Sequence, residues 1–162
     1  MTKRLYIQPL TANELYLLVH DTKALEHSLG VSYQAEPIEG ILKEIFDGQI
    51  IYTEKDALHY YWHTFWLLIR KKDRVVVGSA DFKDLPDQNG NVEIGYGLGK
   101  QFEGNGYMTE AVEAMCTWAL SEQGVSHVTA ETELDGIRSQ HVLKRCGFKP
   151  WYTKDTAWWI RC

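Results

Sequence analysis

The chain has 162 residues and a net charge of −5, and 44% of its residues are hydrophobic and 24% charged. This composition is that of a globular protein long enough to bury a substantial core. Nucleic-acid-binding domains are usually basic, so the negative charge argues against that class. No apolar run approaches the roughly 20 residues of a membrane span, and residues 1–5 lack the apolar core of a signal peptide. We therefore expect one domain over residues 1–162, no membrane or nucleic-acid partner, and a cytoplasmic location in which the three cysteines stay reduced.

The first half of the chain contains two helix signals. Thr11 and Glu14 have the spacing of a capping box, and leucines at helical spacing follow, which predicts a helix over residues 11–26. Residues 37–46 repeat isoleucine and leucine at the same spacing, and Gly48 is expected to end that second helix. The other segments of this half are expected to be a strand over residues 5–10, a loop over 28–36, and a loop with a short helix over 49–63.

The second half is richer in strand signals. Lys72 and Asp73 separate two apolar runs, which predicts a hairpin. Two amphipathic segments predict helices, and Gly147 followed by Phe148 is typical of a helix end with its hydrophobic contact. The expected strands cover residues 64–70, 75–82, 91–98, 126–133, 151–152 and 157–160, and the expected helices cover 107–121 and 137–146. Together these elements predict an α+β fold with a mixed sheet.

A glycine-rich loop joins the strand over residues 91–98 to the helix over 107–121. It reads Gln-Phe-Glu-Gly-Asn-Gly from Gln101 to Gly106. Glycine permits positive φ and close approach to the backbone, and the first N–H groups of a helix attract anions. The loop therefore favours a phosphate ligand, although glycines between a strand and a helix more often only form a turn.

Two familiar phosphate motifs do not fit this loop. A P-loop needs Gly-Lys-Ser/Thr at the helix start, and here Tyr107 and Met108 follow the last glycine. The dinucleotide fingerprint needs a third glycine, where this chain has Thr109. Another nucleotide-binding use of the loop stays open as one interpretation.

The stretch resembles the acetyl-CoA pyrophosphate loop of the GNAT superfamily of N-acetyltransferases, with Gln101, Gly104 and Gly106 at its defining positions. Glu-Ile-Gly-Tyr over residues 93–96 resembles the strand before that loop, and residues 139–148 resemble a later helix segment of the family. The combination is most similar to the branch of ribosomal-protein N-terminal serine or alanine acetyltransferases. The order of elements is that of the GNAT fold, which implies a central, mostly antiparallel sheet with flanking helices.

The resemblance implies acetyl-CoA as co-substrate and assigns it a set of contacts. Loop backbone N–H groups would hold its pyrophosphate, and free backbone groups of the preceding strand would pair with the pantetheine arm. The N–H of Leu98 is the candidate oxyanion donor. Glycines inside that strand mark a bulge or the close approach of another group. The implied co-substrate contacts are Tyr96, Gly97, Leu98, Gln101, Phe102, Glu103, Gly104, Asn105, Gly106 and Tyr107.

Two side chains are candidates for the chemistry. Glu93 is the candidate general base, because an alkyl amine with a pKa near ~10 must lose a proton before it attacks a thioester. Glu93 could instead be an outward-facing strand residue or form an ion pair with a nearby lysine. Ser139 is the candidate hydrogen-bond donor to the departing sulfur, although a serine at a helix start commonly serves as a cap. No histidine or cysteine has metal-ligand spacing, so no metal is inferred.

The expected activity is transfer of an acetyl group to a primary amine through a ternary complex. The acceptor could be a protein N-terminus, an amino-sugar antibiotic, a polyamine or another small amine, and a homodimer is left open. One position departs from the branch, which usually has Asn where this chain has Gly136. That departure leaves room for an alternative, a CoA-binding or sensor module of the same fold with weak or no catalysis.

Overall fold

The computed structural model describes residues 2–162. Its strands are β1 (Leu5–Pro9), β2 (Ser32–Tyr33), β3 (Phe65–Arg70), β4 (Val75–Phe82), β5 (Asn91–Leu98), β6 (His127–Thr132), β7 (Lys149–Thr153) and β8 (Ala157–Arg161). Its α-helices are α1 (Ala12–His20), α2 (Thr22–Leu29), α3 (Gly40–Lys55), α4 (Tyr107–Ser121) and α5 (Ile137–Arg145), and its short 3-10 helices are η1 (Ala57–Trp62) and η2 (Lys100–Phe102).

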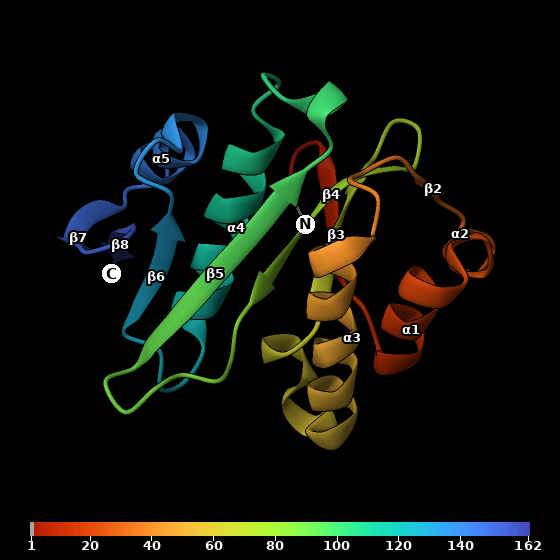
Figure 1. Cartoon of the computed structure of the whole chain (residues 1–162), viewed down its shortest axis with the longest axis horizontal. Coiled ribbons are helices and arrows are strands. Elements are labelled where there is room, and N and C mark those ends of the chain that lie inside the picture. Colours follow the sequence, from red (N-terminus) through yellow and green to blue (C-terminus); the bar gives the residue numbers. More distant parts are fainter. Residues whose placement is uncertain (1) are drawn as a thin grey trace.

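The strands form one sheet with the order β1-β3-β4-β5-β6-β8-β7, and β2 adds to β4 (Figure 1). Only two of the pairs are parallel, β5 with β6 and β2 with β4. The predicted α+β class with a mostly antiparallel sheet is therefore confirmed.

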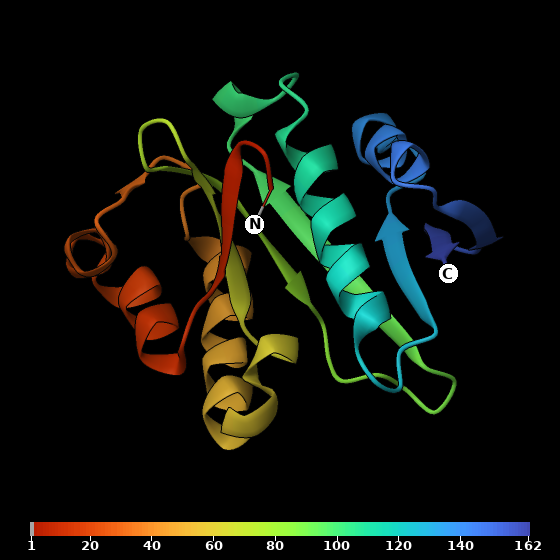
Figure 2. The same cartoon turned by 180° about the vertical axis from the view of Figure 1, so that it is seen from behind.

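Helices cover both faces of the sheet. α1, α2 and α3 lie on one face, and Figure 2 shows α4 across the other. The buried apolar side chains form two clusters, one on each face of the sheet. One joins α4 to β4, β5 and β6 through residues such as Met115 and Val92, and the other joins α1 and α3 to β3 through residues such as Leu15 and Phe46. The sheet is thus held rigidly on both sides, and the ends of β5 and β6 are fixed by this core.

The helix predicted over residues 11–26 is two helices. The predicted capping box at Thr11 is present, but α1 ends at Asp21, whose backbone N–H bonds to the carbonyl of Leu17. The same Asp21 caps α2 by accepting a hydrogen bond from the N–H of Ala24 at 3.1 Å. A carboxylate that can bond to a nearby N–H competes with the continuous helix, and this local bond explains the break.

The second predicted helix is both later and longer than expected. α3 begins at Gly40 and continues through Gly48 to Lys55, so the assignment of Gly48 as its end was wrong. Phe46, Ile50 and Thr53 are buried at helical spacing on either side of that glycine. Tertiary burial of this stripe outweighs the roughly 1 kcal/mol by which glycine disfavours a helix.

The segment expected to be a loop over residues 28–36 contains β2. Ser32 and Tyr33 pair with Val75 and Val76 of β4. β5 pairs with β4 only from Gly78 onward, so β2 occupies the same edge of β4 before that point. This pairing places the carbonyl of Gln34 beside the glycine-rich loop, where it accepts a hydrogen bond from the Gln101 amide at 2.7 Å.

Within residues 2–162, no helix combines the length and the apolar character that crossing a bilayer requires.

Candidate active site

The glycine-rich loop ends in two glycines with left-handed backbone. φ is +78° at Gly104 and +76° at Gly106, and α4 begins at the next residue. The Asn105 side chain donates to the carbonyl of Phe102 at 2.9 Å and so holds the turn closed. The loop therefore delivers the chain to the first turn of α4 in a conformation that L-residues with side chains rarely adopt.

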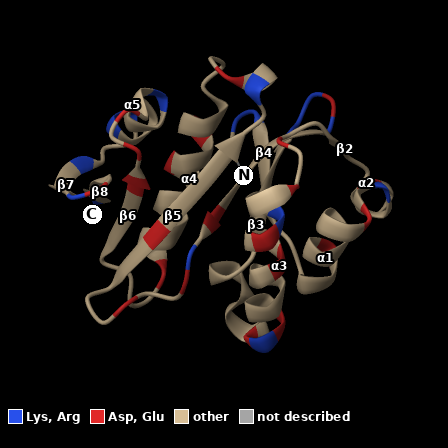
Figure 3. Ribbon diagram, viewed as in Figure 1, with Lys and Arg blue, Asp and Glu red and all other residues tan. Residues whose placement is uncertain are grey.

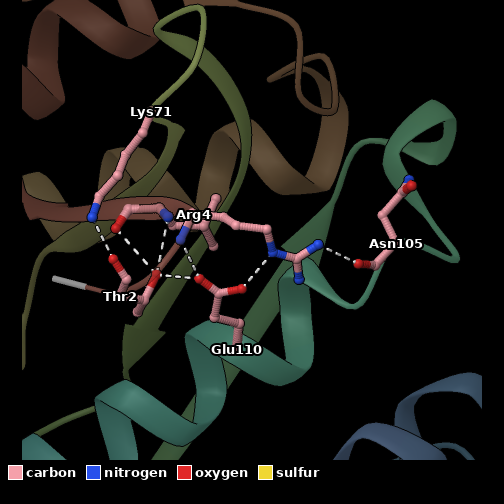
Figure 4. Close-up of polar contacts among 6 residues, drawn as sticks. Thr2, Arg4, Lys71, Asn105 and Glu110 are labelled. Carbon is pink, nitrogen blue, oxygen red and sulfur yellow. Dashed lines mark hydrogen bonds and ion pairs between the residues drawn. The ribbon is translucent and has the colours of Figure 1, made fainter.

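The N-terminal segment secures this loop through Arg4 (Figure 4). The Arg4 guanidinium donates to the carbonyl of Asn105 at 2.8 Å and to the carboxylate of Glu110, in the first turn of α4, at 2.7 Å. The backbone N–H of Arg4 and the hydroxyl of Thr2 donate to the same carboxylate. The guanidinium also lies 4.7 Å from the centre of the Tyr107 ring. These bonds join β1, the loop and α4, and they lower the pKa of Glu110 against the opposing effect of its burial.

Replacing Arg4 by Met should weaken acetyl-CoA binding by about threefold to tenfold, the equivalent of about 1 kcal/mol for a lost charge-assisted bond to the loop. The comparison variant is Arg74→Met, because Arg74 also donates to backbone carbonyls, but to those of Leu29 and Gly30 and not to those of the loop. Calorimetry on both variants measures the effect. If the two variants bound acetyl-CoA equally well, binding would not depend on the hydrogen bond from Arg4 to the Asn105 carbonyl.

The strands beside the loop diverge after Glu93. β5 and β6 pair only from Asn91 to Glu93, opposite residues 127–129. β5 then continues along β4 to Leu98, whereas β6 continues along β8. Figure 1 shows the two strands separating toward α5. From Ile94 to Leu98, the edge of β5 that faced β6 has no strand partner among residues 2–162, which is the arrangement the resemblance implied for a pantetheine arm.

A cavity of about 230 Å³ opens where these strands separate. It brings together the two candidate catalytic side chains, Glu93 from β5 and Ser139 from α5. The other residues that line it are Lys83, Ile94, Gly95, Tyr96 and Glu131. Two positions 46 residues apart in sequence, each predicted from a local motif, thus share one site.

Glu93 binds a proton more readily in this site than a glutamate side chain does in water. Burial is the largest cause of its raised pKa, and the carboxylates of Glu131 and Asp81 add to it, while Lys83 opposes it. Figure 3 shows acidic positions on the neighbouring strands β4, β5 and β6. A carboxylate with a raised pKa is a stronger proton acceptor once ionised, as a general base requires.

The hydroxyl of Ser139 contacts Tyr96 across the opening. Tyr96 Oη and Ser139 Oγ are 2.7 Å apart, and Oη also lies 3.3 Å from the Ser139 carbonyl oxygen. Burial raises the pKa of Tyr96 to about 12, with the bond to Ser139 acting in the opposite direction. The phenol therefore keeps its proton at neutral pH. Tyr96 was predicted to contact the co-substrate through its backbone, and its side chain adds a second hydroxyl next to Ser139.

The loop side chains point to structural partners. Phe102 and Tyr107 are buried in the core, and Glu103 forms an ion pair with Arg138 of α5. The side chain of Gln101 bonds to Gln34. Of the predicted loop contacts, those from Gln101 to Tyr107 are thus available to a ligand mainly through the backbone.

Asp81 and Lys83 are site residues that the sequence analysis missed. Asp81 lies on β4 and is only 3% exposed, and burial raises its pKa against the opposing effect of Lys83. Lys83 Nζ is 3.3 Å from the Asp81 carboxylate. A carboxylate inside the otherwise apolar and small-residue run of β4 was the available signal.

Gly95 of β5 marks close approach by another group, one of the two interpretations offered for the glycines of this strand. The register of β4 with β5 is regular from Gly78 to Phe82. A Cβ atom at Gly95 would lie 2.6 Å from Lys83 Nζ and 2.8 Å from Asp81 Oδ1, so only glycine leaves room for this ion pair.

A second cavity, of about 140 Å³, adjoins the first on the α3 side of β5. Lys83 and Tyr96 line both cavities. The wall toward α3 is apolar, with two carboxylates at Glu36 and Asp81. Its remaining residues are Tyr33, Ala35, Leu42, Ile45, Phe46, Phe65, Ser79 and Gly97.

Gly136 lies at the N-cap of α5 with φ −73° and ψ 58°, which is not left-handed backbone. Its N–H donates to the carbonyl of Glu133 at 3.0 Å. A Cβ atom here would lie 3.2 Å from that carbonyl oxygen. Glycine at this position therefore relieves crowding in the turn before α5, and its backbone angles do not themselves require it.

Within residues 2–162, no group of three or more His, Cys, Asp or Glu side chains is arranged to hold a metal ion. The site consists of a helix-start loop, an unpaired strand edge, a half-buried carboxylate and two hydroxyl groups.

A strand edge that opens beside a glycine-rich helix start is the arrangement that the resemblance to the GNAT acetyltransferases implied, and sequence comparison agrees. A family profile described as "Acetyltransferase (GNAT) domain" matches residues 4–149, so the chain belongs to this family. GNAT proteins use acetyl-CoA as acyl donor, as the resemblance implied.

Particular relatives can also be named. The chain is 39% identical over 83 residues to the uncharacterized N-acetyltransferase YjdG of Bacillus subtilis, a match that covers 51% of this chain and 49% of YjdG. The chain thus spans about half the length of that relative. In fold, it is similar to the ribosomal-protein-S5-alanine acetyltransferase of Vibrio fischeri, with a TM-score of 0.71, 14% identity, and coverage of 99% of this chain and 94% of that one.

A second solved structure is similar to the same degree. It is RimL, a ribosomal L7/L12 α-N-protein acetyltransferase in complex with coenzyme A, with a TM-score of 0.68, 15% identity, and coverage of 99% and 94%. The structural neighbours thus include ribosomal-protein acetyltransferases, and at these identities the likeness concerns the fold.

Proposed function

We propose that the protein is an acetyl-CoA-dependent N-acetyltransferase that acts on a primary amine, as one domain over residues 1–162. The observation that carries the proposal is the cavity at the divergence of β5 and β6, where Glu93, Tyr96 and Ser139 meet. It lies next to the edge of β5 that has no strand partner among residues 2–162, and β5 leads through η2 to the loop at the start of α4. Donor binding, proton removal and thiolate release thus each have a group in one site.

The geometry supports direct attack in a ternary complex. The acceptor amine would enter through the α3-side cavity and lose its proton to Glu93, directly or through a water molecule. The backbone N–H of Leu98 would stabilise the oxyanion. A CoA thiol with a pKa near that of cysteine, about 8.5, leaves readily as a thiolate, and the Tyr96 and Ser139 hydroxyls would donate to it.

Ligand binding and turnover together test the proposal. A ligand at a hundredfold excess over its Kd stabilises a protein by about 2.7 kcal/mol, which should raise Tm by about 5–10 °C for acetyl-CoA but not for ATP or NAD. Release of CoA should then be measured with a peptide N-terminus, a polyamine and an aminoglycoside as acceptors. A shift without turnover on any amine would favour the binding-module alternative, and a shift with ATP or NAD alone would favour a nucleotide ligand.

A further inference from the structure

A primary amine of the chain itself lies inside the candidate active site. Lys83 follows directly after β4, and its side chain lines both cavities, the one with Glu93 and Ser139 and the one toward α3. The side chain is 46% exposed, so it can be reached by a donor in the cleft. Within the described residues 2–162, no other lysine lines either cavity.

The ammonium group is held against the middle of β5. Its Nζ is 3.3 Å from Asp81, and its distance of 2.6 Å from a Cβ built on Gly95 places it directly over that residue. Gly95 is two positions after Glu93, so the two positions face the same side of β5. Lys83 also lines the same cavity as Glu93, Tyr96 and Ser139. An acceptor amine needs a place in one site with a proton acceptor and the donor thioester.

We infer that Lys83 is an acetyl acceptor, modified by its own active site when acetyl-CoA is bound and no external amine is present. The inference rests on the proposed acetyltransferase function and adds a modification site to it. Asp81 orients the amine, and the absence of a side chain at Gly95 leaves room for it.

The chemistry balances with acetyl-CoA as the only co-reactant. The Lys83 ammonium gives one proton to Glu93, and the free Nζ attacks the thioester carbonyl, forming a C–N bond. Collapse of the tetrahedral intermediate breaks the C–S bond; the hydroxyls of Tyr96 and Ser139 donate hydrogen bonds to the departing thiolate, which then takes up the proton held by Glu93. The nitrogen loses its second proton to solvent. The products are N-acetyl-Lys83, CoA thiol and one net proton.

This modification would change the charge of the acceptor cavity. Of residues 2–162, Lys83 is the one cation that lines the two cavities, where it faces the carboxylates Glu36, Asp81, Glu93 and Glu131. Acetylation removes that cation, and the buried Asp81 loses its ion-pair partner. The modified site would then attract cationic amines more strongly. Because the modification consumes acetyl-CoA, the modified fraction of Lys83 would also report how much acetyl-CoA had been available.

The test is site-resolved mass spectrometry after incubation of the full chain with isotopically labelled acetyl-CoA. Lys72, in the exposed β3–β4 turn, serves as the internal reference for spontaneous acetylation. Positioning beside a base should make labelling of Lys83 about a hundredfold faster than labelling of Lys72, and independent of protein concentration. Glu93→Gln should remove most of this difference without affecting Lys72.

External turnover in the same samples separates the inference from the proposed function. A protein that acetylates an added amine but labels Lys83 no faster than Lys72 would overturn the inference alone. A protein that does neither would overturn the proposed function as well. Mixing wild type with a mass-tagged Glu93→Gln chain checks the route, since equal labelling of Lys83 in both chains would show transfer between molecules and contradict self-modification. Lys83→Arg, which keeps the charge next to Asp81, should abolish the label at this position and leave labelling of Lys72 unchanged.

Discussion

Replacing Glu93 by Gln should lower kcat/KM for any accepted amine by about 10²–10⁴-fold, the usual contribution of general-base catalysis. The substitution keeps the volume of the side chain and its place in the β5–β6 opening, but it removes the proton acceptor. Affinity for acetyl-CoA should stay near that of the wild type, because the proposed donor contacts come from the loop and the β5 backbone. Initial rates and calorimetry on the two proteins measure both quantities.

The raised pKa of Glu93 also predicts the direction in which activity changes with pH. Since burial raises the pKa of Glu93, the base is lost by protonation at a higher pH than for an ordinary glutamate. The wild type should therefore lose activity on the acid side of neutrality, at a pH above the usual glutamate range. The Gln variant should lack that step, and its residual rate should rise with pH as more free amine becomes available.

Glu131→Gln is the matched control, because it changes another carboxylate of the same cavity. The Glu131 charge helps to raise the pKa of Glu93, so its removal should move the acid limb to lower pH and leave the plateau rate nearly unchanged. If Glu93→Gln kept the wild-type rate and profile while Glu131→Gln lost activity, the base would be Glu131.

Local sequence signals predicted most elements of this fold. The capping box at Thr11, the hairpin between β3 and β4, and the helix over residues 107–121 all depend on neighbours within a few residues, and each is present. Of the three differences, the break at Asp21 follows from a local bond, whereas β2 and the length of α3 depend on tertiary contacts. Asp21 could have been read as a cap, but only packing of Phe46 and Ile50 against the sheet shows that α3 continues through Gly48.

In the candidate site, too, some residues could be predicted from local sequence signals and others could not. Glu93, Ser139 and the loop glycines could be predicted because each belongs to a short motif of its own. Asp81 and Lys83 could not, because their place depends on the register that sets Asp81 opposite Gly95. Arg4 lies 101 residues from Asn105 in sequence, and only the fold brings its guanidinium to the loop carbonyl.

Gly106→Val should weaken acetyl-CoA binding by well over tenfold, or about 1.4 kcal/mol and more. The backbone at Gly106 has φ +76°, a conformation that a β-branched residue adopts only at high cost. A Cβ atom here would also lie 3.4 Å from the Arg4 guanidinium. Valine must therefore either strain the N-cap of α4 or rotate it to negative φ, which turns the first N–H groups of the helix away from the proposed phosphate position.

The matched control for this variant is Gly30→Val. Gly30 has φ +62° at the end of α2, and a Cβ atom there meets nothing within 4 Å, so valine introduces a similar backbone strain far from the loop. Both variants should lose thermal stability, by about 1–2 kcal/mol for a left-handed residue with a side chain. Only Gly106→Val should lose affinity for acetyl-CoA by calorimetry. If the two folded variants bound acetyl-CoA equally well, the donor phosphates would not lie on this loop, and the anion site at the start of α4 would have to be abandoned.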